Sequence, residues 1–194
     1  MSSGTTKRTA AKPTTRSGST TFVSRWPVYA IVGFVGLFCV VVAVLWIRSH
    51  VILGEEIDAT AWVIAGTTLL RVVTILIALA SIQQWGSRLP QSLVAMGLWG
   101  CAAAQLVYPL AELAVKLAIL AGIAELPSRG VGDMSSIGWF NVSMAWLIFG
   151  VPGALFVLAA RSHRNRGERP VGPWPVIGLV SGVLLLLAIG IAIG

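Results

Sequence analysis

Five long apolar runs dominate this sequence of 194 residues. They cover residues 27–47, 61–82, 92–122, 137–160 and 174–193. Roughly 20 helical residues are needed to cross the hydrocarbon core of a bilayer. A helix satisfies its own backbone hydrogen bonds there, whereas the strands of a membrane barrel show alternating apolar and polar residues. The continuous runs therefore predict an all-α integral membrane protein with five transmembrane helices.

Lysine and arginine set the predicted orientation. The segment before the first run carries five basic residues and no acid, and the connection after the fourth run carries four arginines. The connection after the first run instead holds Glu55, Glu56 and Asp58 beside Arg48. Short cytoplasmic segments are enriched in basic residues. We therefore expect the N-terminus inside and the C-terminus outside.

Residues 1–26 differ in composition from the transmembrane domain expected at 27–194. They are rich in serine, threonine and basic residues, which is typical of a disordered cytoplasmic tail. Much of the net charge of +7 lies in this tail and in the connection at 161–169. Basic segments beside a membrane bind anionic lipid headgroups. We expect this role, and no nucleic-acid binding, because no recognition fold accompanies the charge.

Arg71 interrupts the second run with a full positive charge. Placing an arginine at the centre of a bilayer costs roughly 3 kcal/mol, so partners must offset it. The third run offers Gln105, Glu112 and Lys116, which fall on one stripe of a helix. We call Arg71, Gln105, Glu112 and Lys116 the polar seam, and we expect it to join the second helix to the third.

Spacing suggests how the polar seam is connected. Glu112 and Lys116 stand four residues apart in the order that favours a helical ion pair. Pro109 cannot donate to the carbonyl of Gln105, so that oxygen is free for Arg71. The lean of side chains in antiparallel helices also brings Arg71 towards Glu112, while Lys116 can extend to water. The polar seam is either a structural lock or an ion or proton path in which Glu112 titrates.

Other residues have roles in helix shape and packing. Pro109 and Pro152 predict kinks. Asn141 is a possible contributor to the polar seam. Gly178 and Gly182 form a G-x-x-x-G spacing, which lets another helix approach closely. That helix belongs either to this chain or to another one.

Catalytic and cofactor motifs are missing from the sequence, and the acids near His50 fit no standard metal site. We therefore expect no enzymatic activity, no cofactor and no metal. The leading hypothesis is a structural or accessory component of a membrane assembly, with a membrane protein partner or a second copy of the chain. The alternative is a small ion or proton-coupled transporter. A preference for arginine over lysine, with many Ala, Gly and Val residues, favours a bacterial cytoplasmic membrane.

Overall fold

The computed structural model describes residues 25–125, 130–166 and 172–193. All regular elements within these ranges are helical. The main helices are α1 (Trp26–Ile47), α2 (Ala59–Ala80), α3 (Gln91–Leu120), α4 (Ser136–Ala145), α5 (Val151–Arg166) and α6 (Trp174–Ile193). Each predicted apolar run is helical. The predicted disorder of the tail lies outside the described residues, apart from the last two positions of the tail.

Four stretches of helix are long and apolar enough to cross a membrane: Trp26–Ile52, Ala59–Ala80, Gln91–Leu120 and Ser136–Asn165. In α6 the apolar segment with described side chains, Trp174–Ala188, is shorter. Trp62 and Trp139 are exposed near helix ends. Indole rings favour that position because it lies at the boundary between lipid and water.

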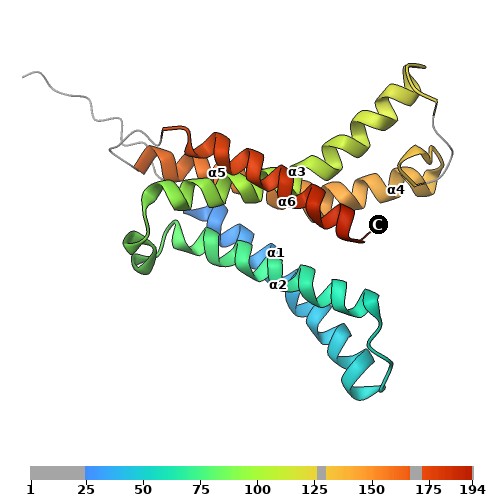
Figure 1. The fold of residues 1–194 in the computed structure, drawn as a ribbon, viewed down its shortest axis with the longest axis horizontal. Coiled ribbons are helices and arrows are strands. Elements are labelled where there is room, and N and C mark those ends of the chain that lie inside the picture. The colour runs from blue at the N-terminus through green and yellow to red at the C-terminus, as the bar shows by residue number, and fades with distance from the viewer. Residues whose placement is uncertain (1–24, 126–129, 167–171, 194) are drawn as a thin grey trace, which may run out of the picture.

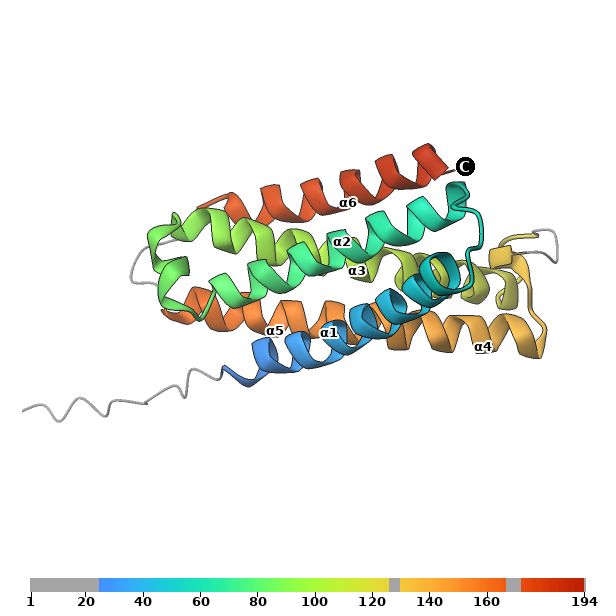
Figure 2. The ribbon, with the colours of Figure 1, turned by 90° about the horizontal axis from the view of Figure 1, so that it is seen from below.

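Pro152 acts on the fourth run through an unusual turn rather than a sharp kink. Its missing N–H leaves the carbonyl of Ile148 without the usual helical donor. The chain widens into a π-helical turn at Trp146–Gly150, in which the N–H of Val151 donates to the carbonyl of Trp146. Such turns hold one extra residue within a helix. As a result α4 and α5 run end to end (Figure 2).

The third run changes direction within one helix. Figure 1 shows α3 bending in the half that contains Pro109, as the missing hydrogen bond of a proline allows. The helix ends where Gly122 takes a positive φ of 68°. The N–H of Ile123 then donates to the carbonyl of Ala118 at 2.9 Å, which satisfies an oxygen at the helix end.

Two groups of helices form the bundle. α3 packs against α6 and α5, whereas α2 packs mainly against α1, which also contacts α5. The largest core side chains, among them Ile31, Leu98 and Phe156, lie where these groups meet. Towards the α1–α2 connection, the two helices diverge from the rest of the bundle (Figure 1). The contact of α2 with α3 is therefore much smaller than the polar seam hypothesis requires.

Glycines allow α6 to lie against α3. A Cβ atom on Gly178 would overlap the backbone of Met96, and one on Gly182 would overlap the backbone of Gly100. The matched order of these contacts shows that the two helices run parallel. The G-x-x-x-G spacing thus serves packing within the chain, by the close backbone approach typical of such sites.

The helix connections lie at the two ends of the bundle (Figure 2), and their charged residues differ from one end to the other. Arg25 and Arg88 precede α1 and α3, and Arg161 and Arg164 lie in the last turns of α5. That helix continues to Arg166, so three arginines expected in a connection are helical. The α1–α2 connection, which contains Glu55, Glu56 and Asp58, lies at the opposite end, as does the segment before α4, which contains Asp133 (Figure 2).

Low pH is expected to weaken the N-terminal ends of α2 and α4, which lie at this second end of the bundle. The carboxylate of Asp58 accepts from the N–H of Ala61 at 2.7 Å, and that of Asp133 accepts from the N–H of Ser135 at 2.9 Å. These hydrogen bonds hold the pKa of both groups below the ordinary 3.8. Their stabilising effect is complete above pH 3.8 and is lost as the pH falls through the lowered pKa values.

The measurement is the melting temperature in detergent between pH 7 and pH 3. Asp58→Asn keeps a capping oxygen but cannot titrate, so its curve should fall less at low pH. Glu56→Gln, a change at an exposed residue two positions away, is the matched control and should follow the native curve. An Asp58→Asn curve that coincides with the native curve would contradict the prediction.

Candidate functional site

Arg71 lies on α2 between two aromatic rings. Its guanidinium carbon is 4.2 Å from the ring centroid of Phe38 on α1 and 4.9 Å from that of Phe149 in the π-helical turn. A cation on aromatic faces gains about 2 kcal/mol when it is desolvated. The rings contact the guanidinium but do not accept its N–H bonds in the plane. Its Nη1 atom is buried and has no hydrogen-bond partner among the described residues.

The threonine hydroxyl groups near Arg71 do not hydrogen-bond to its guanidinium. Thr67 and Thr68 donate to the carbonyl of Ile64, at 3.0 and 2.8 Å. Thr74 donates to the carbonyl of Arg71 itself at 2.7 Å. Such bonds to the preceding turn are the usual way in which a helix satisfies these side chains. These three threonine hydroxyls are thus satisfied within α2.

Glu112 lies on α3 and is only 5% exposed. Its Oε2 atom has no hydrogen-bond partner among the described residues. The Tyr108 side chain, one turn earlier, interacts with this carboxyl group. The Tyr108 ring packs edge-on against Phe149, with 5.9 Å between centroids. Aromatic rings thus stand between Arg71 and Glu112, and the expected contact between these two charges is not made.

Lys116 is completely buried, with 0% exposure. Its Nζ atom donates to the backbone carbonyl of Asp133 and lies 5.7 Å from the ring centroid of Trp139. It neither extends to water nor forms an ion pair with Glu112, in contrast to both expectations. The reason is that the connection before α4 folds over the end of α3 and supplies a nearer acceptor.

Gln105 and Asn141 take separate positions. The Oε1 atom of Gln105 is buried without a hydrogen-bond partner among the described residues. Gln105 lies beside Gly153 of α5, where an added Cβ would be 3.5 Å from the Gln105 Cβ and 2.6 Å from Leu106 Cγ. Asn141 is exposed on α4. The polar seam is therefore dispersed: Arg71 sits among α1, α2 and the π-helical turn, and its other members lie on α3.

A groove of about 410 Å³ lies between parts of α1 and α2. We call it the α1–α2 groove. Leu45, Trp46 and His50 line it from α1 and the turn that follows, and Ile64 and Arg71 line it from α2. Because most of this surface is apolar, Arg71 is its main source of charge. Its two helices diverge from the bundle, as described above.

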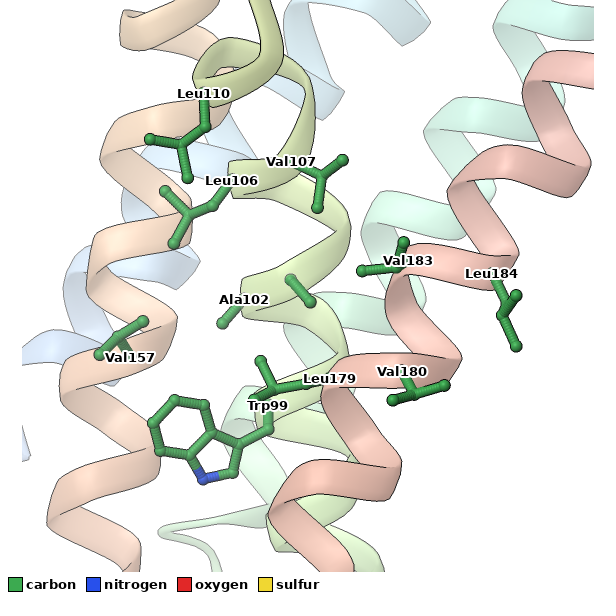
Figure 3. Close-up of a pocket in the computed structure, with 11 residues that line it drawn as sticks. Trp99, Ala102, Leu106, Val107, Leu110, Val157, Leu179, Val180, Val183 and Leu184 are labelled. Atoms are coloured by element: carbon green, nitrogen blue, oxygen red, sulfur yellow. The ribbon is translucent and has the colours of Figure 1, made fainter. Parts of the chain in front are cut away.

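A larger groove, of about 510 Å³, lies among α3, α5 and α6 (Figure 3). Its lining has no polar surface. Side chains such as Trp99, Leu106, Val157 and Val183 surround it, and the polar seam does not reach it. This groove offers no group for acid–base chemistry or for binding an ion.

Sequence reasoning missed the groups that hold the charges. Phe38 and Phe149 lie far from Arg71 in the sequence, and a phenylalanine in an apolar run carries no signal that it faces a cation. The acceptor for Lys116 is a backbone carbonyl, which every residue has. Only the three-dimensional arrangement distinguishes these groups from their neighbours.

Metal binding finds no support in the described ranges, where no three His, Cys, Asp or Glu side chains gather into a possible site. Cys39 and Cys101 are buried and unpaired. The Sγ atom of Cys39 lies 4.0 Å from the carbonyl of Thr68, which links α1 to α2. Compared with protein-family models, curated proteins and solved structures, the chain matches none of them.

Proposed function

We propose that this chain is a five-helix protein of a bacterial cytoplasmic membrane and a non-enzymatic component of a membrane assembly. α6 is the fifth crossing in this proposal. The basic end of the bundle faces the cytoplasm, where it binds anionic lipid headgroups, and the acidic end faces outside. The arginines in and near the connections at one end, and the acids of the α1–α2 connection and Asp133 at the other, support this orientation.

The Nη1 atom of Arg71, buried without a hydrogen-bond partner among the described residues, is the observation that carries the assembly role. A charge inside a bilayer is costly unless it is paired or hydrated. Within the described residues, neither Glu112 nor a carbonyl of α3 accepts a hydrogen bond from Nη1 of Arg71, so the polar seam is not completed there. A component that is completed by another protein accounts for this, whereas a self-contained lock does not.

Purification in mild detergent from the native membrane tests the assembly role. We expect a companion protein at a constant ratio through successive columns. A monomer or homo-oligomer without a companion would contradict the proposal. The crossing of α6 has a separate test: a tag after Gly194 should be accessible from outside intact cells, and a tag at the N-terminus should not be.

A proton-coupled or ion transporter is the second candidate, and Glu112 is the observation in its favour. Its carboxyl group is buried in a helix that also contains Pro109, and one of its oxygens is unpaired. Ionisable residues within membrane helices often mark ion and proton pathways. Flux of protons or monovalent ions in liposomes, abolished by Glu112→Gln with the fold unchanged, would favour this role over the first.

A further inference from the structure

Resting on the assembly role, we propose that the α1–α2 groove binds a transmembrane helix of a different protein. This partner helix carries an aspartate or glutamate near the middle of the bilayer, and its carboxylate pairs with Arg71. The inference identifies both the surface and the chemistry of the partner.

The donors of Arg71 determine the chemistry. Phe38 and Phe149 contact the guanidinium, whose Nη1 atom is buried without an acceptor among the described residues. Arg71 also lines the α1–α2 groove, and the carboxylate would reach the guanidinium from that side. A carboxylate matches the planar fork of an arginine and forms two parallel hydrogen bonds with it. Thr67 and Thr68 donate to their own helix, so their hydroxyl protons do not compete for that carboxylate.

The depth of Arg71 in the bilayer determines which kind of molecule can bring a carboxylate to it. Arg71 lies twelve residues along α2 from Ala59, which is about 18 Å at helical rise. This distance places it well inside a hydrocarbon core of about 30 Å. Lipid phosphates remain in the headgroup zone, so a carboxylate at this depth has to belong to a transmembrane segment.

The walls of the groove suit a helix. Leu45 is 56% exposed and Ile64 is 40% exposed, so apolar surface flanks Arg71 and remains uncovered by the rest of the chain. A partner helix would cover these side chains while its acid reaches the guanidinium. The contact combines apolar packing with one charged pair, as is common within membranes.

A second copy of this chain does not fit the groove. Among the seven acids of the sequence, only Glu112 lies within a predicted membrane run. Its side chain is buried against its own helices and cannot project into a neighbour. The other six acids lie in the segments between the predicted runs: Glu55, Glu56, Asp58, Glu125, Asp133 and Glu168. The carboxylate must therefore come from a different protein.

A synthetic transmembrane peptide tests this pairing directly. The probe is a leucine–alanine helix with one glutamate at its centre, and the matched peptide has glutamine there. Energy transfer between the labelled peptide and the full chain in phosphatidylcholine vesicles reports association. We expect the glutamate peptide to bind about five-fold more tightly, the size of an interhelical polar contact in a bilayer. The preference should disappear in Arg71→Gln and persist in Arg71→Lys.

Two further variants keep the result interpretable. Ile64→Trp fills the groove without changing Arg71 and should weaken binding of the glutamate peptide even if Arg71→Gln fails to fold. Arg88→Gln removes one charge from the connection between α2 and α3 and should bind as the native protein does. Equal binding of the two peptides, or a preference that survives Arg71→Gln, would overturn the inference.

The two proposals fail in different ways. The peptide experiment needs no native companion, so a protein that purifies alone contradicts the assembly role without changing the peptide result. A companion that has no acid in its transmembrane segments overturns the pairing with Arg71 and leaves the assembly role intact.

Discussion

Gly182→Leu is expected to separate α6 from α3 and to reduce stability by about 3 kcal/mol, the upper end of the range for overpacked cores. The reason is that the first atom of any side chain at this position would overlap the backbone of Gly100. A backbone cannot turn aside as a flexible side chain can. Gly178→Leu meets the backbone of Met96 and should act in the same direction. The fraction of protein that remains monodisperse after heating in detergent measures the effect.

Gly36→Leu is the matched control for this prediction. An added Cβ at Gly36 has no atom within 4 Å, so the same substitution introduces no clash. Its effect on stability should stay within about 0.5 kcal/mol, as for most surface changes. If Gly182→Leu and Gly36→Leu melt together, α6 does not pack on α3 through its glycines.

Lys116→Ala is expected to have the second large effect, a loss of about 3 kcal/mol. The substitution removes a wholly buried side chain, which leaves a cavity, and it also leaves the Asp133 carbonyl without its donor. The connection at Gly130–Asp133 should then detach from the end of α3. Limited proteolysis of the detergent-solubilised protein, combined with a melting curve, measures both consequences.

Lys116→Met separates the hydrogen bond from the packing. Methionine keeps most of the volume but donates nothing, so the connection should become open to protease while the melting temperature falls much less than in Lys116→Ala. Arg88→Met removes a basic residue from the other end of the bundle and should leave the connection protected. Full protection in Lys116→Met would show that the hydrogen bond to Asp133 does not hold the connection.

Helix positions were predictable because they depend on local composition. A run of apolar residues fixes where a helix lies, and the observed bounds of α1 and α6 differ from the predicted runs by a single residue at most. The end of α3 was harder to place, since it depends on the positive φ of Gly122. Local chemistry still explains that difference of two residues.

Helix partners were not predictable in the same way. Neighbours in the sequence suggested that α2 and α3 share the polar seam, whereas small residues place α6 beside α3 and leave α2 with α1. The opposite charges of Arg71 and Glu112 suggested a pair, yet Phe149 and Tyr108 stand between them. Which surfaces meet depends on the fit of all helices together, and no single spacing encodes it.

The π-helical turn before Pro152 also determines which way α5 faces. One extra residue in a helix rotates everything after it by about 100°, since each residue advances the helix by that angle. This offset lets a single continuous helix direct Phe156 into the core while Phe149, seven residues earlier, lies over Arg71. Removal of one residue from Trp146–Gly150 would turn the two ends of the helix out of register. The π-helical turn thus sets the rotation of α5, which faces the core, relative to Phe149, which contacts Arg71.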